Sequence, residues 1–348
     1  MSPTGLESVP TLAEPAVGDA LLGPAAGVAA SVFWVVTSVF FTAAGRRIGS
    51  TAVNCFRLVL AVLLLGGTHW LLAGSLWPEM LQEQLVLLAI SGVVGLTLCD
   101  QALFTSFLDI GPRRALLCMT TSPVFALAIG VVFLGERLGL ASLVGVAITV
   151  GGVAWVIAER KPQTTVGAQA HPEHLKRGIV LAVTAALLQA LGAMLSKRGI
   201  GHGLIDDPSQ HMTAHAASFV RMVFGLLGVI PLALWYVLVH RRQDGHAERK
   251  AKRVGTATGG YALAAAGAVV GPFLGMWMSL VAFDRTPLLG VAQALCSLSP
   301  VIILPFAALI EKERLSPRAV IGALLAVVGA AGLFFTDQID SWLAGLFG

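Results

Sequence analysis

One acidic side chain lies deep in an otherwise apolar stretch of the sequence. Asp100 occurs in LTLCDQALF, more than halfway along the apolar residues 85–108. A charge at such depth in a bilayer costs about 2.5–3.5 kcal/mol on insertion scales, so it usually faces a bundle interior or a wet cavity. Asp100 can bind a polar solute, carry a coupling proton, or neutralise Arg57, which lies about 9 Å inside the neighbouring stretch 51–73. The sequence leaves these roles open.

Uncharged polar and aromatic side chains occur in the same kind of stretch. Amides, hydroxyls and indoles can position a polar solute without the desolvation cost of a charge. The alternative is hydrogen bonding between helices, which is common in membrane bundles and contributes about 0.6 kcal/mol per bond. For each residue alone, packing is the favoured explanation. The candidate solute-binding residues are Trp34, Thr37, Asp100, Gln101, Thr120, Thr121, Gln189, Trp277 and Gln293.

The composition indicates an integral membrane protein. Of 348 residues, 56% are hydrophobic and 12% are charged, and the mean hydropathy is +0.82. Charges are missing over stretches of about twenty residues, which is enough to cross about 30 Å of hydrocarbon as a helix. We predict an all-α protein because a helix satisfies its own backbone hydrogen bonds in lipid. The ten predicted transmembrane helices are 25–44, 51–73, 85–108, 112–134, 139–158, 178–196, 212–239, 259–283, 287–310 and 317–336.

Cysteine and histidine placement predicts no metal and no cofactor. The four cysteines lie in apolar runs without CxxC spacing, so we expect reduced packing residues. His211 and His215, beside His202, have an i, i+4 spacing that can hold zinc, but no HExxH glutamate accompanies them. Asp207, followed by proline, is better explained as the N-cap of helix 212–239.

The chain contains an internal duplication. SPVFALAIGVVFLGERL at 122–138 matches SPVIILPFAALIEKERL at 299–315, and GVVGLTL at 92–98 resembles AVVGPFL at 268–274. A polar segment divides the predicted helices into five and five. We therefore predict a disordered tail at 1–20, a first repeat at 21–160, a cytoplasmic linker at 161–177 and a second repeat at 178–348.

The two repeats must be inverted, because an odd number of helices brings the second repeat into the membrane in the opposite sense. Most of the 23 Lys and Arg residues fall in loops 1–2, 3–4, 5–6, 7–8 and 9–10. By the positive-inside tendency these loops are cytoplasmic, which predicts both termini outside.

Two inverted five-helix repeats with this SP(V)…ERL-like fourth helix resemble the EamA-type family of the drug/metabolite transporter superfamily. The resemblance covers about 21–336, although Lys312 replaces the glycine before the second glutamate. It implies a secondary carrier or exporter of small metabolites, amino acids, sugars or drugs. It also implies a cavity lined by helices 1, 3 and 4 together with 6, 8 and 9.

Several duplicated or charged residues are predicted to have structural roles. Pro123 and Pro300 should kink helices four and nine, either as hinges or as static bends. Glu136 and Glu313 should cap the helix that follows each of them, on opposite membrane faces. Arg57, if it does not pair with Asp100, and Arg221 are expected to extend to the membrane interface.

Matched glycines mark one face of helices five and ten. Small residues seven positions apart let two helix backbones approach closely. We expect these two helices to form a scaffold pair, and a homodimer seam is the alternative. The glycines are Gly145, Gly152, Gly322 and Gly329.

The sequence as a whole predicts a secondary transporter in the cytoplasmic (inner) membrane, exporting an amino acid-like or drug-like solute by alternating access. No P-loop is present, so coupling would come from an ion gradient, exchange or the solute gradient, with Asp100 as the proton carrier if protons are used. The expected partners are the solute and the lipid bilayer, not nucleic acid, and the protein would be a monomer or a homodimer. An intramembrane enzyme and a non-transporting scaffold or sensor are the alternatives, and we expect no enzyme activity.

Overall fold

The computed structural model describes residues 17–48, 50–110, 115, 118–137, 139–158, 172–240, 256–299, 301–302, 317–333 and 339, and these contain helices and no strand. The first half comprises α1 (Val17–Ile48), α2 (Ser50–Ala73), α3 (Gln82–Gly92), the π-helix η1 (Val93–Leu98), α4 (Cys99–Ile110), α6 (Ser122–Leu134) and α7 (Leu140–Ala158). The second half comprises α8 (Pro172–Ile200), the 3₁₀ helix η2 (Pro208–Gln210), α9 (Ala214–His240), α10 (Ala257–Ala268), the π-helix η4 (Val269–Gly275), α11 (Met276–Arg285), α12 (Leu289–Cys296) and α14 (Pro317–Leu333).

The helices have the length and composition of a multi-pass membrane protein. Six are long and apolar enough to cross a bilayer, and three shorter apolar helices accompany them in the described part of the chain. This confirms the all-helical membrane architecture, while the number ten stays a prediction. The six candidate spans are Leu21–Phe41, Ala52–Ala73, Gln82–Leu103, Leu175–Ile200, Ala214–Pro231 and Ala257–Arg285; the shorter helices are Ser122–Leu134, Leu140–Gly152 and Val320–Gly329.

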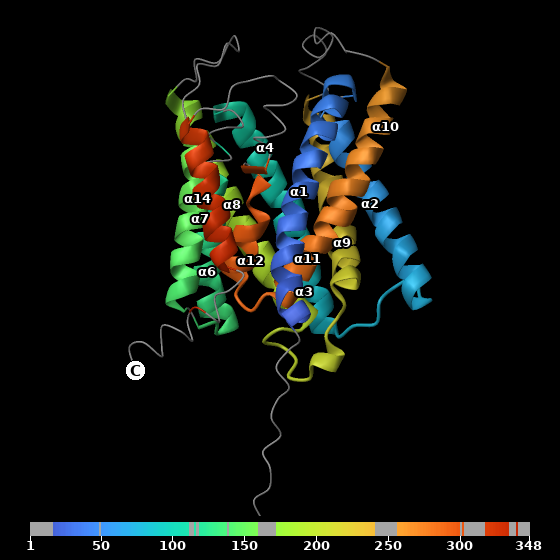
Figure 1. Ribbon diagram of the computed structural model, residues 1–348. Helices are drawn as coiled ribbons and strands as arrows, with labels where there is room; N and C mark the ends of the chain where they lie inside the picture. The colour runs from blue at the N-terminus through green and yellow to red at the C-terminus, as the bar shows by residue number, and fades with distance from the viewer. Residues whose placement is uncertain are drawn as a thin grey trace, which may run out of the picture.

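Helices of the two halves pack against each other in matching pairs, as expected for two repeats related by a twofold axis. In Figure 1, α1 lies beside α10 and α11, and α7 lies beside α14. The packing of α8 on α3 and α4 corresponds to the packing of α1 on α10 and α11. In addition, α2 packs on α9 and α6 packs on α12. Swapping the two halves therefore reproduces these contacts between the halves.

The third helix of each half widens into a π-helix at the duplicated glycine-containing segment. η1 separates α3 from α4, and η4 separates α10 from α11. Each π segment contains a glycine against which a side chain from another helix packs: Gly95 faces Arg221, and Gly271 faces Thr37. π-helical turns are rare and often lie at functional sites.

The fourth helix of the first half is interrupted just before the duplicated Ser-Pro sequence. Thr120 and Thr121 form a turn, and the Thr121 hydroxyl donates to the Cys118 carbonyl at 2.6 Å. Pro123 lies in the first turn of α6, where a backbone N–H is not needed. The prediction that Pro123 kinks a continuous helix is therefore wrong, because the proline begins a new helix after a break.

The corresponding interruption in the second half is bonded to α1. The Ser31 hydroxyl donates to the Leu295 carbonyl at 2.7 Å and accepts from the Leu298 N–H at 3.2 Å. The Ser299 hydroxyl donates to the Ser31 carbonyl at 3.1 Å. Backbone groups left free at a helix end are thus satisfied by a neighbouring helix. Pro300, the matching proline, lies outside the described residues.

Close contact between α7 and α14 follows the glycine pattern. A Cβ on Gly152 would lie 2.5 Å from the Ala326 nitrogen and 2.7 Å from the Gly322 carbonyl oxygen. A Cβ on Gly329 would lie 2.6 Å from the Thr149 nitrogen. Gly145 is also buried on α7, and its carbonyl accepts from the Thr149 hydroxyl. The two helices therefore form an intramolecular scaffold pair.

Replacing Gly152 with leucine should destabilise the protein, because the new side chain would meet backbone atoms that cannot move aside. Overpacking of this kind costs about 1–3 kcal/mol. The measurement is thermal unfolding in detergent, followed by tryptophan fluorescence. Gly151→Leu is the matched control, since a Cβ there meets no heavy atom within 4 Å. Equal melting temperatures for the two variants would contradict the packing described for α7 and α14.

Candidate functional site

Three charged side chains from α2, α4 and α9 lie near η1, and two of them, Arg57 and Arg221, are buried while Asp100 is partly exposed. Arg57 Nη2 donates to Asp100 Oδ2 at 2.6 Å, and Arg57 Nε donates to Asn54 Oδ1 at 2.8 Å. The side chains of Arg57 and Asp100 are 10% and 22% exposed, and Arg221 is 3% exposed. Arg221 is close enough to Asp100 for a direct electrostatic interaction. Of the roles left open for Asp100, the structure contains the ion pair with Arg57.

Glycines from two helices make the space that Arg221 occupies. A Cβ on Gly95 of η1 would collide with Arg221 Nη2, and a Cβ on Gly192 of α8 would lie 3.3 Å from the same atom. The expectation that Arg221 extends to the membrane interface is therefore wrong, while for Arg57 the predicted alternative, pairing with Asp100, is the one observed. Arg57 has a carboxylate partner, and Arg221 lies in a space lined by glycine.

Arg221 is poorly neutralised by its surroundings. Its Nη1 donates to the Met276 sulfur at 3.6 Å, and its Nε has no hydrogen-bond partner in the part of the chain that the structure describes. An unsatisfied buried donor costs about 1–3 kcal/mol, and more when it is charged. Because Asp100 is bonded to Arg57, the two guanidinium groups and one carboxylate leave a positive charge at Arg221. Such a group can bind the carboxylate of a solute.

The aromatic candidates lie at the contact of α1 with α10 and α11. Trp34 Nε1 donates to the Ser279 hydroxyl at 3.5 Å, and the Thr37 hydroxyl donates to the Gly267 carbonyl at 3.2 Å. Trp277 packs edge-on against the His215 ring with 4.6 Å between centroids. These residues form part of the interface between the halves but are not hydrogen-bonded to the Arg57–Asp100 pair.

The three glutamine candidates differ in position. Gln189 of α8 accepts a hydrogen bond from the Cys99 thiol at 3.6 Å, which places it beside the charged cluster. Gln293 of α12 is 4% exposed, and its Oε1 has no partner among the described residues. Gln101 is exposed on α4. The structure therefore groups Gln189 with Asp100 and separates Gln101 from this buried environment.

A second buried ion pair joins the two halves at the end opposite α4. Glu136 Oε1 lies 2.7 Å from Lys197 Nζ, and the two side chains are 6% and 5% exposed. Both Glu136 oxygens accept from the Leu289 N–H at 3.0 Å. Lys197 also donates to the Thr286 carbonyl at 3.2 Å and to the Pro287 carbonyl. Glu136 thus caps α12 of the other half, and the prediction that it caps the helix following it in sequence is wrong.

Local backbone geometry allows Glu136 to reach across the interface. Gly135 ends α6 with φ +65°, a left-handed conformation that glycine adopts without strain. Gly130, one turn earlier, has no side chain to obstruct the carboxylate. Lys197 was not among the predicted residues, because the predicted helix 178–196 ended before it, whereas α8 continues to Ile200. Glu313 lies outside the described residues.

The histidines do not form the pair that their spacing indicated. His215 faces α2, where its Nε2 lies 2.7 Å from the Thr68 hydroxyl. His211 instead lies against His202, with 4.9 Å between ring centroids, and His202 Nε2 is 2.9 Å from Asp284 Oδ1. Asp284 was not predicted to lie near these histidines, because it belongs to α11 and is 82 residues away from His202 in the sequence.

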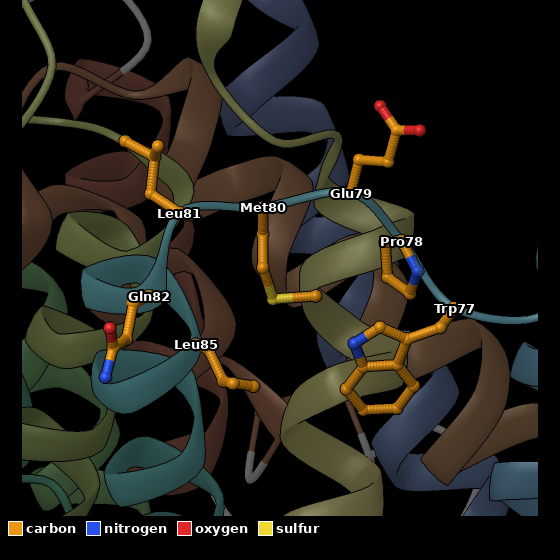
Figure 2. A pocket seen from close by; sticks show the side chains of 7 residues that line it. All are labelled: Trp77, Pro78, Glu79, Met80, Leu81, Gln82 and Leu85. Atoms are coloured by element: carbon orange, nitrogen blue, oxygen red, sulfur yellow. The ribbon is translucent and has the colours of Figure 1, made fainter.

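A surface hollow of about 550 Å³ lies beside the segment that joins α2 to α3. Figure 2 shows Met80 and Trp77 directed to one side of this segment and Glu79 to the other. None of the predicted solute-binding residues lines the hollow. The lining residues are Trp77, Pro78, Glu79, Met80, Leu81, Gln82 and Leu85.

Comparison with known proteins agrees with the two-repeat organisation. The EamA-like transporter family model matches residues 21–158 and again residues 176–335. The chain belongs to the EamA-like transporter family. Its double match covers both halves, and a family of transporters agrees with the prediction that the protein is not an enzyme. No curated protein matches the chain.

A solved structure described only as "Crystal structure of protein" has the same fold. It superposes with a TM-score of 0.64 at 18% identity, covering 89% of this EamA-like chain and 95% of the other chain. At this identity the likeness extends to the fold alone.

Removing the Lys197 ammonium group should leave Glu136 buried without its cation, so Lys197→Ala should strongly lower stability. The expected loss is about 3–5 kcal/mol, typical for breaking one side of a buried ion pair. Arg198→Ala is the control, since within the described ranges the Arg198 side chain makes only a long contact, at 3.5 Å, to the Phe133 carbonyl. Thermal unfolding in detergent measures both. The double variant Glu136→Gln, Lys197→Met should recover part of the lost stability. Equal melting temperatures for Lys197→Ala and Arg198→Ala would contradict the role of the pair.

Proposed function

We propose that this protein is a secondary transporter that exports a small organic solute by alternating access. The supporting observation is the charged cluster of Arg57, Asp100 and Arg221 in a member of a transporter family. Arg57 and Asp100 belong to the first half, and Arg221 belongs to the second. A site shared by two inverted halves can open to either side of the membrane as the halves rock against each other.

The charges of this cluster favour an amino acid-like solute over an uncharged drug-like one. Arg221 offers a buried guanidinium with an unsatisfied Nε, which suits a carboxylate. Asp100 offers a carboxylate that is 22% exposed and suits an ammonium group. Gln189, beside Cys99, adds an amide acceptor close to the same position. A zwitterionic solute would complement both charges without leaving either one unpaired.

Asp100 is also the proposed carrier of a coupling proton. Its hydrogen bond from Arg57 is strongest with the ionised carboxylate, so protonation would remove the ionic attraction and weaken the hold of each side chain on the other. A change of this kind at the interface between the halves is a local electrostatic event that can bias one arrangement of the bundle over another. The proposed cycle needs no cofactor.

The proposed location is the cytoplasmic (inner) membrane, with both termini outside. The distribution of Lys and Arg among the loops supports this orientation. It puts the Glu136–Lys197 pair at the outer end, closing the bundle there and leaving the solute to enter from the cytoplasm. The intramolecular packing of α7 on α14 supports a monomer as the transporting unit.

Purified protein in liposomes should transport amino acids saturably. Analogues that lack the carboxylate should lose about 10- to 100-fold in kcat/KM, which corresponds to one charge-assisted hydrogen bond. Asp100→Asn should lower transport by a similar factor and remove its dependence on a pH gradient. Radiolabelled uptake with and without an imposed gradient measures both effects.

The matched control for this experiment is Asp206→Asn, the same change at an exposed loop carboxylate. It should leave flux and pH dependence as in the wild type. If no member of an amino acid, sugar, nucleoside and cationic drug panel were transported, the transporter proposal would fail. Equal flux of amino acids and their decarboxylated amines would refute the assigned solute class alone.

Fusion of reporters to the chain tests the proposed orientation. An alkaline phosphatase domain after Gly348 should be active, because this enzyme folds only outside the cytoplasm, and a green fluorescent protein at the same position should be dark. A fusion after Thr165, in the predicted cytoplasmic linker, is the control and should give the opposite pair of signals. Fluorescence from the C-terminal fusion would overturn the orientation.

A further inference from the structure

Two histidines and one aspartate converge at the end of the bundle that contains the Glu136–Lys197 pair. His202 and His211 lie in the connection between α8 and α9, and Asp284 lies in the last turn of α11. One ligand atom from each residue lies within 4.8 Å of the other two. All three side chains are partly exposed, so ions from solution can reach them.

The donor atoms have the chemistry and spacing of a zinc site. Tetrahedral Zn²⁺ binds His nitrogen and Asp oxygen at about 2.0–2.2 Å, which places ligand atoms about 3.3 Å from one another. His202 Nε2 and Asp284 Oδ1 are 2.9 Å apart, so a slight separation would admit the ion between them. The third ligand atom, from His211, lies within 4.8 Å of the other two and needs to move inward by up to about 1.5 Å to reach this spacing.

Neighbouring groups orient these ligands as they do in metal sites. His211 Nε2 lies 3.1 Å from the Ile205 carbonyl, and a hydrogen bond there leaves the Nδ1 lone pair free for a metal. Arg285 Nε donates to Asp284 Oδ2 at 3.1 Å, which leaves Oδ1 available. Supporting bonds to the second ring nitrogen or the second carboxylate oxygen are a regular feature of histidine and carboxylate ligands.

The loop between α8 and α9 folds back on itself, so that His211 lies beside His202. Gly201 has φ +143° and Gly203 has φ +67°, conformations that favour glycine. The Met212 N–H donates to the Ile200 carbonyl at 2.8 Å and closes the loop. A Cβ on Gly201 would collide with the His211 ring, so only glycine allows the ring to occupy this position.

Asp207 holds the middle of the same loop and is not one of the converging ligands. Its Oδ1 accepts from the Ser209 N–H at 2.9 Å and caps η2, not the transmembrane helix α9 as the sequence predicted. Hydrogen bonds from Ser209 lower the pKa of Asp207 below its ordinary value.

We propose that His202, His211 and Asp284 form a binding site for a divalent transition metal ion such as Zn²⁺, with solvent in the fourth position. The ion would join the α8–α9 loop to the end of α11. Lys197 lies five residues before His202, and its partner Thr286 lies two residues after Asp284. A bound ion would therefore hold closed the same end of the bundle that the Glu136–Lys197 pair closes. Inhibition of transport by the ion rests on the proposed function, whereas binding does not.

The test uses full-length protein in detergent, purified with a tag that lacks histidine and treated with chelator. Equilibrium dialysis against Zn²⁺ should give one ion per chain and a higher melting temperature. Co²⁺ should develop the visible absorption of a tetrahedral N/O site. His202→Ala, His211→Ala and Asp284→Asn should each weaken binding at least tenfold, while Asp206→Asn, in the same loop, should bind as the wild type does.

Less than one zinc ion per wild-type chain would overturn the proposal, as would undiminished binding by His202→Ala and His211→Ala. The wild-type titration and the cobalt spectrum decide the matter even if a variant fails to fold. In liposomes, Zn²⁺ on the outer side should slow wild-type transport and not that of His211→Ala. Stoichiometric binding without any transport in either protein would keep the metal site and reject the proposed function.

Discussion

The cost of burying charge in a lipid environment is the constraint on which this structure depends. A lone charge inside the bundle is tolerated only when another group supplies the missing interactions. Glu136 and Lys197 meet this requirement by pairing across the two halves, and Glu136 in addition satisfies the free backbone N–H at the start of α12. One ion pair thereby fixes the end of α6, the side of α8 and the start of α12 relative to one another.

The same requirement is met in a different way at the other end of α8. Arg177 donates two hydrogen bonds to Asp109, at 2.7 and 2.5 Å, and so ties α8 to the end of α4. Asp284, which lies at the end of α11 as Asp109 lies at the end of α4, is bonded to His202 and Arg285. Equivalent carboxylates thus serve opposite membrane faces with different partners. The halves therefore differ in these partners, while the packing of α1 on α10 and α11 is matched by that of α8 on α3 and α4.

Sequence patterns predicted those structural features that depend on composition or on residues close together along the chain. The helical membrane fold, the two repeats and the approach of α7 to α14 follow from apolar length, duplication and glycine spacing, all of which are local or periodic. The reach of Arg57 to Asp100 followed from comparing their depths. Glu136 was assigned the right chemistry, capping, but the wrong helix, because the capped N-terminus comes from the other half of the chain.

The remaining errors have the same physical origin. Arg221 is buried because Gly95 and Gly192 come from two other helices and leave room for it, and no pattern near Arg221 indicates this. Pro123 begins a helix because Thr121 closes a turn before it, whereas proline within an apolar run is equally typical of a kink. The His202–Asp284 contact joins residues whose separation in sequence carries no periodic signal.

The paired π-helices have a consequence for the ancestry of the protein. A π turn contains one more residue than the α turn it replaces, so it changes the direction in which every later side chain of that helix points by about 100°. η1 and η4 occupy matched positions, and the simplest history is that this extra residue was already present in a single five-helix unit before duplication. That unit would have needed an oppositely inserted copy of itself to complete the bundle, and fusion made this pairing permanent. Only afterwards could the helices that follow the two π turns become unequal, with Asp100 near the start of α4 and Trp277 near the start of α11, which gave the bundle a charged side and an aromatic side.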